Sequence, residues 1–131
     1  MGARYIDRTL TWARGFHARG LMRARVSWAH VEHFDPCAGK AALSRVVLGL
    51  VDIGGRWWRS VDVVVPTRER PNARETFAAT IGSVVSARKV LDMQRGALIP
   101  ELRGLWLDVA VRDGCVVWIR RPDAEEGSAA E

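Results

Sequence analysis

The chain alternates apolar and polar residues with a period of two over long stretches, which is the pattern of half-buried β-strands. The clearest pair of such stretches covers residues 43–53 and 56–65, with Gly54-Gly55 between them and Pro66 after them. Two glycines between alternating segments indicate a two-residue hairpin turn, which fixes the residues that face each other. We therefore predict a β-hairpin with one apolar and one mixed face. The mixed face is predicted to carry Arg45, Val47, Val51, Ile53, Arg56, Trp58, Ser60, Asp62 and Val64.

A second hairpin is predicted near the C-terminus, where Asp113-Gly114 separates residues 105–112 from residues 115–121. Asp-Gly is a favoured pair for a tight turn with positive φ at both positions. A two-residue turn makes Val109 face Trp118, and both faces of the hairpin are then largely apolar. We therefore expect this hairpin to lie inside the sheet, covered on both sides.

The N-terminal part also alternates, over residues 4–12 and 19–33, with Gly15 and Gly20 between the two segments. A helix over 19–33 would scatter its charged residues around the cylinder, so a strand is favoured over a helix. Simple alternation places Met22, Ala24, Val26 and Trp28 on one face and Arg23, Arg25 and Ser27 on the other.

A single long helix is predicted over residues 73–95, between the two hairpins. Asn72 and Glu75 have the spacing of a capping box at its start, and Gly96 is a typical stop. Its apolar stripe consists of Phe77, Ile81, Val84, Val85 and Leu91. The predicted fold class is α+β, with a mostly antiparallel sheet, in the chain order β-β-β-β-α-β-β, packed on this one long helix.

The composition is that of a globular protein, since 48% of the 131 residues are hydrophobic and 27% are charged. We expect a single α+β domain over residues 1–121 and a disordered acidic tail over residues 122–131. No apolar run approaches the roughly 20 residues that cross a bilayer, and no signal segment opens the chain. A cytoplasmic protein without a membrane partner is therefore expected.

Charge is distributed unevenly along the chain. The whole sequence carries a net charge of +5, but residues 1–121 hold 20 basic and 11 acidic side chains, a net charge of +9. A body of this charge attracts polyanions through counterion release. Only two of the 20 basic residues are lysines, a bias that genome composition produces without any ligand. The acidic tail would compete within the chain for the same basic surface.

Candidate catalytic and metal-binding residues are few. His30, His33 and Cys37 are close in sequence, but on a strand the two histidines point to opposite faces, so no metal or cofactor is predicted. We expect Cys37 and Cys115 to be packed thiols rather than a disulfide. His17 and His30, with nearby arginines, are the residue types of a metal-independent ribonuclease, in which one imidazole takes a proton and the other donates one. No residue spacing selects this chemistry, so no catalytic residue is assigned and an enzyme is the third hypothesis.

The most informative cluster is Arg56-Trp57-Trp58-Arg59 in the first hairpin. Strand alternation directs Trp57 to the apolar face and Trp58 to the mixed face. A flat aromatic side chain between guanidinium groups suits base stacking with phosphate neutralisation, and it suits a protein interface equally well. Packing of Trp58 beneath other strands is the competing explanation, because most of the six tryptophans are expected in the core. The predicted binding residues are Trp58, Arg56, Arg59, Arg23, Arg25 and Arg45.

These observations predict a small basic binding module without catalytic activity, which engages nucleic acid or a nucleoprotein complex through an Arg/Trp sheet face. The alternative is a protein-binding module, either a phage or mobile-element inhibitor that meets an acidic protein surface or a subunit of an assembly. The sequence does not distinguish DNA, RNA and protein partners, and it is compatible with a homo-oligomer.

Overall fold

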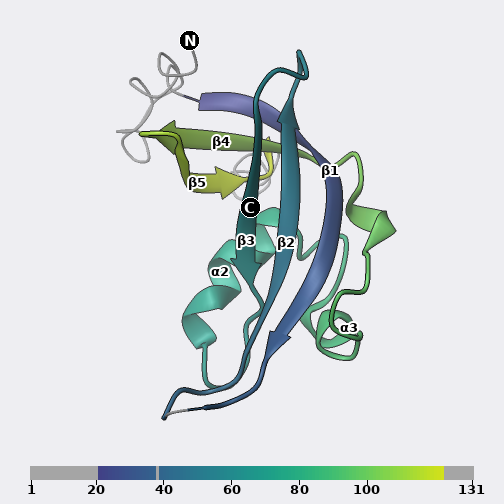
Figure 1. Ribbon diagram of the computed structural model, residues 1–131, viewed down its shortest axis with the longest axis vertical. Helices are drawn as coiled ribbons and strands as arrows, with labels where there is room; N and C mark the ends of the chain where they lie inside the picture. Colours follow the sequence, from purple (N-terminus) through teal and green to yellow (C-terminus); the bar gives the residue numbers. More distant parts are fainter. Residues whose placement is uncertain (1–20, 38, 123–131) are drawn as a thin grey trace, which may run out of the picture.

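The computed structural model describes residues 21–37 and 39–122 (Figure 1). Its centre is a five-stranded antiparallel sheet in the order β3-β2-β1-β4-β5. The strands are β1 (Leu21–Phe34), β2 (Leu43–Asp52), β3 (Trp58–Val64), β4 (Trp106–Arg112) and β5 (Cys115–Arg120). The helical segments are η2 (Pro71–Ala73), α2 (Arg74–Thr80), α3 (Ala87–Leu91) and η3 (Pro100–Leu102). The mostly antiparallel sheet is confirmed, while the strand predicted over 4–12 and the tail beyond Pro122 lie outside the described residues.

The core lies between the sheet and the helical segments, which pack on one of its faces (Figure 1). The helical side contributes Phe77, Ile81, Val85, Val90, Ile99 and Leu102. The sheet contributes Val46, Leu48, Leu50 and Val63 from the first hairpin and Leu107, Val109 and Val111 from the second. Within residues 21–37 and 39–122 no helix covers the opposite side of the sheet, which we name the open face.

A β-bulge in β1 reverses the two faces of that strand halfway along its length. The register with β2 shifts between Val26 and Trp28. The buried residues of β1 are Met22, Ala24, Val26, Ala29 and Val31. An inserted residue changes the alternation from even to odd positions, so the prediction of Trp28 on the apolar face was wrong. Trp28 lies instead on the open face, as Arg25 does.

The second hairpin has its predicted turn but also contains a bulge. Both turn residues of Asp113-Gly114 have positive φ, 52° and 80°. Beyond the turn the register shifts between Ala110 and Val111, so that Trp118 pairs with Ala110 and not with Val109. The predicted pairing of Trp118 was therefore wrong, and this second bulge turns Trp118 to the open face.

The C-terminal hairpin is not enclosed in the sheet as predicted, because β5 forms an edge. Val117 is 50% exposed. The two cysteines, Cys37 and Cys115, are free as expected but are exposed rather than packed. The prediction thus holds for β4, whose residues Leu107, Val109, Ala110 and Val111 are buried, but not for β5.

The first hairpin has its predicted register although its connection is longer than a two-residue turn. Val51 pairs with Trp58, as the alternation requires. The carboxylate of Asp52 accepts hydrogen bonds from the backbone N–H groups of Arg56 (2.8 Å) and Trp57 (3.0 Å). These two bonds hold the connection in a fixed shape.

The long helix predicted over residues 73–95 is instead two short helices, and the predicted capping box is absent. Asn72 lies inside η2, and the residue that precedes α2 is Ala73, which has no side-chain cap. Pro71 at the first position of η2 starts the helical path instead, because its fixed φ suits a first turn.

The break between the helices has a local cause. The N–H groups of Ile81 and Gly82 both donate to the carbonyl oxygen of Phe77, at 3.0 and 2.8 Å, which ends α2. Ser86 then adopts an extended conformation and starts α3, where its hydroxyl oxygen accepts from the N–H of Lys89 at 3.1 Å. Gly82 and Ser86, which interrupt the apolar stripe, therefore indicate two helices rather than one.

Candidate functional site

Four register partners form a continuous row across the open face. Trp58 of β3 pairs with Val51 of β2, Val51 pairs with Arg25 of β1, and Arg25 pairs with Trp106 of β4. We name these four residues the aromatic row. Trp58 is 51% and Trp106 39% exposed, and Arg25 is exposed between them. The row therefore presents two accessible indoles with a cation between them.

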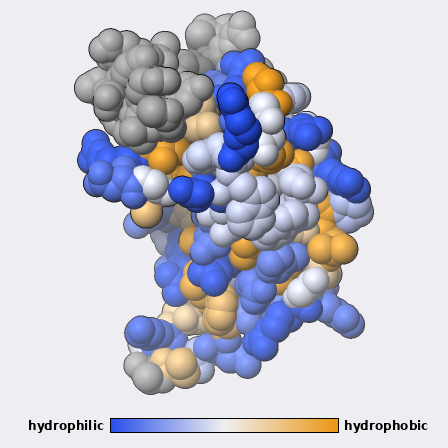
Figure 2. Space-filling view, turned by 45° about the horizontal axis from the view of Figure 1, so that its top comes forward, coloured by the Kyte–Doolittle hydropathy of each residue, from blue (hydrophilic) through white to orange (hydrophobic). Residues whose placement is uncertain are grey.

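Trp28 extends the aromatic surface beside the row. Its ring centroid is 6.3 Å from that of Trp58, with an interplanar angle of 44°. On its other side it stacks on the imidazole of His30, at 5.5 Å and 13°. The Nε2 atom of His30 is 2.9 Å from a carboxylate oxygen of Glu32. In the tilted view of Figure 2, pale and orange side chains gather near the centre with strongly hydrophilic ones around them.

Two of the predicted arginines lie on the open face but are already paired. Arg23 Nε lies 2.9 Å from Asp108 Oδ1. Arg45 Nη1 lies 2.8 Å from Asp62 Oδ2, and the Arg45 guanidinium is 4.9 Å from the centroid of the Phe34 ring. Both positive charges are therefore largely balanced within the protein.

Of the five predicted arginines, Arg59 and Arg56 do not join this surface. Arg59 lies on the covered side of β3, where its guanidinium is 5.8 Å from the Trp57 ring and donates to the carbonyl oxygen of Gly114 at 2.8 Å. Arg56 is exposed in the connection after β2. Of the six predicted binding residues, the structure thus brings Trp58 and Arg25 into one row and places Arg23 beside them.

Three further residues of this surface, Trp28, Trp106 and Leu98, were not predicted from the sequence. Leu98 bridges to His30 at the edge of β1 and is 66% exposed. No tryptophan belongs to the fully buried core in the described part of the chain, and only Trp57 packs partly against it. In the sequence, Gly49 could have indicated that a side chain such as Trp28 packs closely against β2, because a glycine within a strand often marks the close approach of another group.

The two histidines of β1, His30 and His33, lie on opposite sides of the sheet. His33 Nδ1 is 2.7 Å from the Ser44 hydroxyl, and its Nε2 is 2.7 Å from the carbonyl oxygen of Met93. His30 lies on the open face with Trp28. The described residues contain no group of three His, Cys, Asp or Glu side chains that could hold a metal ion. His17 lies outside the described residues, so the hypothetical His17–His30 pair is not located.

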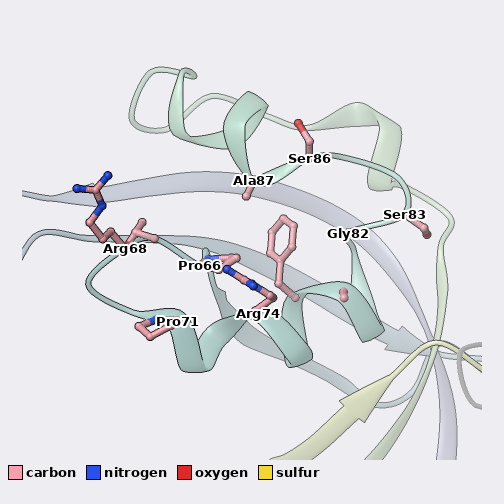
Figure 3. A pocket seen from close by; sticks show the side chains of 11 residues that line it. Pro66, Arg68, Pro71, Arg74, Gly82, Ser83, Ser86 and Ala87 are labelled. Atoms are coloured by element: carbon pink, nitrogen blue, oxygen red, sulfur yellow. The ribbon is translucent and has the colours of Figure 1, made fainter. Parts of the chain in front are cut away.

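A cleft of about 960 Å³ lies away from the open face, between α2 and the start of α3 (Figure 3). Its two serine hydroxyls already have partners: Ser83 accepts from Arg121 at 2.6 Å, and Ser86 accepts from the N–H of Lys89. Figure 3 shows Arg74 extending toward Pro66 and the Ser86 hydroxyl turned toward α3. With these hydroxyls engaged inside the protein, the open face is the stronger candidate.

Comparison of the chain with models of known families, with curated proteins and with solved structures gave no match. Among the helices of the described residues, none is long and apolar enough to cross a membrane. The candidate site therefore stands on its own geometry: an open sheet face with a row of exposed indoles around Arg25.

Proposed function

We propose that the chain is a binding module whose open face holds single-stranded nucleic acid, alone or in a nucleoprotein complex. The observation that carries this proposal is the aromatic row, in which Arg25 lies between two exposed indoles. Base stacking on an aromatic ring contributes roughly 1–3 kcal/mol per base and tolerates any base, because every base has a flat π-face. Arg25 forms none of the ion pairs found among the described residues, so its charge is available to a phosphate.

The dimensions of the row favour a short single strand. Neighbouring strands lie roughly 4.8 Å apart, so four strands place Trp58 and Trp106 about 14 Å from each other. That span suits two or three extended nucleotides. Bases in a duplex are stacked on one another and are not free to stack on indoles, whereas unpaired bases are.

Because two arginines of the open face are already paired, we expect stacking to contribute more to the affinity than charge does. Arg23 and Arg45 are balanced by Asp108 and Asp62 on the same face. The salt dependence for single strands is about −0.7 in log K per neutralised phosphate. We therefore expect a shallow slope, of about −1 to −2, rather than the steep slope of a fully basic groove.

The test is fluorescence anisotropy with a labelled 12-nucleotide oligothymidine, titrated with the full chain at several salt concentrations. Trp58→Ala and Arg25→Ala should each weaken binding by about fivefold or more. Leu91→Ala and Arg88→Ala are matched controls, because both residues are exposed on α3 in the helical layer. The labelled duplex of the same length should bind more weakly.

Absence of binding at low salt would refute the proposal. Equal losses for the α3 controls and the open-face variants would also refute it, because the affinity would then follow net charge rather than the row. Oligonucleotide quenching of the tryptophan fluorescence gives an independent readout of stacking.

A second candidate function is protein binding, as an inhibitor or as a subunit of an assembly. It is favoured by the mixture of ion pairs and exposed apolar side chains on the same face, among them Leu98 and Phe34. Interfaces between proteins combine aromatic anchors with arginine in this way. Capture of a partner that survives nuclease treatment and is lost in Trp58→Ala would support this function over the first.

A further inference from the structure

The outer edge of β3 is a second surface, separate from the open face. Two backbone hydrogen bonds fix the bonding pattern of the hairpin: Val65 N–H donates to the carbonyl oxygen of Ser44 at 2.9 Å, and Asp52 N–H donates to that of Trp57 at 3.2 Å. In an antiparallel pair, residues that bond to the partner strand alternate with residues whose N–H and C=O point away. The odd-numbered residues of β3 therefore bond to β2. The residues whose backbone groups point outward are Trp58, Ser60, Asp62 and Val64.

One end of this edge is closed by an arginine. Arg59 Nη1 donates to the carbonyl oxygen of Trp58 at 2.8 Å, while its Nε donates to Gly114. Apart from the bonds to β2, no backbone hydrogen bond forms from Ser60 to Val64 in the described part of the chain. The open edge is therefore a short stretch with three outward-pointing residues.

The stretch from Ser60 to Val64 has little of the usual protection against strand addition. Natural edge strands carry a bulge, a proline or charged side chains, or are covered. The register of β3 with β2 is regular over all seven of its residues, and the one charged side chain between Ser60 and Val64, Asp62, is paired with Arg45 at 2.8 Å. An edge of this kind is a template for another extended segment.

Two hollows accompany the edge on the side of α2, which lies beside β3 in Figure 1. Their volumes are about 440 and 420 Å³, and Asp62 and Thr76 line both. Side chains on one face of an added strand are roughly 7 Å apart, so neighbouring ones can enter adjacent hollows.

The rims of these hollows carry acidic and basic side chains, in a chain whose net charge is +5. Glu75 lines the first hollow and Glu69 the second, and both are exposed. Neither carboxylate forms an ion pair within the described residues. Arg70, on the rim of the second hollow, donates to the carbonyl oxygen of Ala42 at 3.3 Å, and Arg120, on the rim of the first, lies over the Trp118 ring at 5.6 Å. Both rim arginines are thus directed to groups of the protein, and the carboxylates of Glu69 and Glu75 are the ones that an added basic side chain can reach.

We propose that the free edge of β3 from Ser60 to Val64 accepts an extended peptide with basic side chains, which adds to the sheet as a sixth strand. The backbone of the peptide bonds to Ser60, Asp62 and Val64. Its alternate lysine or arginine side chains reach Glu75 and Glu69. This interaction does not depend on nucleic-acid binding at the open face.

The probe is a fluorescein-labelled seven-residue peptide of alternating valine and arginine, added to the full chain and followed by anisotropy. A peptide of alternating valine and glutamate is the control, and it should not bind. Ser60→Pro should weaken binding at least tenfold, because proline removes an outward N–H while the bonds of β3 to β2 remain. Ser60→Ala keeps the N–H and should bind like the parent. Glu69→Gln with Glu75→Gln should weaken binding about three- to tenfold.

If Ser60→Pro does not fold, amide hydrogen exchange in the unmodified chain tests the same proposal. In the unmodified chain, the arginine peptide should slow exchange at Ser60, Asp62 and Val64 and leave the α3 amides unchanged. Binding without this protection would overturn the proposal, and so would the same affinity for both peptides. A dimer that dissociates on Ser60→Pro would also overturn it, because the edge would then pair with a second copy of the chain.

Discussion

The indole of Trp28 lies over the backbone of Gly49 on the neighbouring strand, at a distance that leaves no room for a side chain there. A methyl group at Gly49 would overlap the Cε2, Nε1 and Cζ2 atoms of the ring. The ring is held in this position by its stack on His30 and its contact with Trp58. The absence of a side chain on β2 is thus what allows the aromatic surface of the open face to form.

The substitution Gly49→Ala should therefore displace the Trp28 ring and lower the free energy of unfolding by about 1–3 kcal/mol. Urea unfolding followed by tryptophan fluorescence measures the change. Gly54→Ala is the control, because an added Cβ there meets only the Arg56 side chain at 3.4 Å, an ordinary contact. Equal stability of the two variants would contradict this account of Trp28.

Neutralising Asp108 should release Arg23 from its ion pair and strengthen binding of oligothymidine at the open face. We expect Asp108→Asn to bind about two- to fivefold tighter, with a salt slope steeper by up to about 0.7. Asp92→Asn, on the helical side at the end of α3, changes the net charge equally. If Asp92→Asn strengthened binding as much, net charge rather than Arg23 would be responsible.

The hydroxyl of Ser86 begins α3, so its removal should destabilise the helical layer. Ser86→Ala should lower the free energy of unfolding by about 0.5–2 kcal/mol, because the N–H of Lys89 loses its acceptor. Ser86→Asp retains an acceptor oxygen and should restore most of the loss. Thermal unfolding followed by circular dichroism compares the three proteins, and identical midpoints would show that the cap contributes nothing.

The carboxyl group of Glu101 should titrate below its ordinary range. Its hydrogen bond from Lys89, at 2.7 Å, is the main cause of the lowered pKa, and a backbone hydrogen bond adds to it. Because the pKa in the folded protein is lowered, the stabilisation is present above the unfolded pKa and is lost as the pH falls through the folded pKa. A carbon-13 NMR titration should show an acid-shifted midpoint, and Lys89→Met should move it upward. An unchanged midpoint in that variant would assign the shift to another group.

Much of the strand content followed from local periodicity and turn chemistry. Strand pairing in the first hairpin was correct because Val51 and Trp58 are close in sequence and the short connection leaves little choice of register. The Asp113-Gly114 turn was correct because Asp-Gly tolerates positive φ at both positions. The location of Trp58 on an exposed face followed from the same alternation.

The helix was predicted as one element because its apolar stripe continues across the break. Phe77, Ile81 and Val85 are buried as expected, but Val84 and Leu91 are 38% and 39% exposed. Periodicity counts apolar positions and does not detect a chain that changes direction between them. The hydrogen bonds at Gly82 and Ser86 decided that change of direction.

The sequence by itself determined the strand segments from β1 onward, the register near each turn and the excess of positive charge. Tertiary structure decided that Trp28 and Trp118 lie on the open face, because their positions depend on the two bulges. At the bulge in β1, the N–H and C=O of Val26 bond to Leu105 and Gly104, far along the chain. Because these partners are distant in sequence, the alternation of residues around Trp28 gives no sign of the bulge. The exposed aromatic row therefore became visible only when all strands were placed side by side.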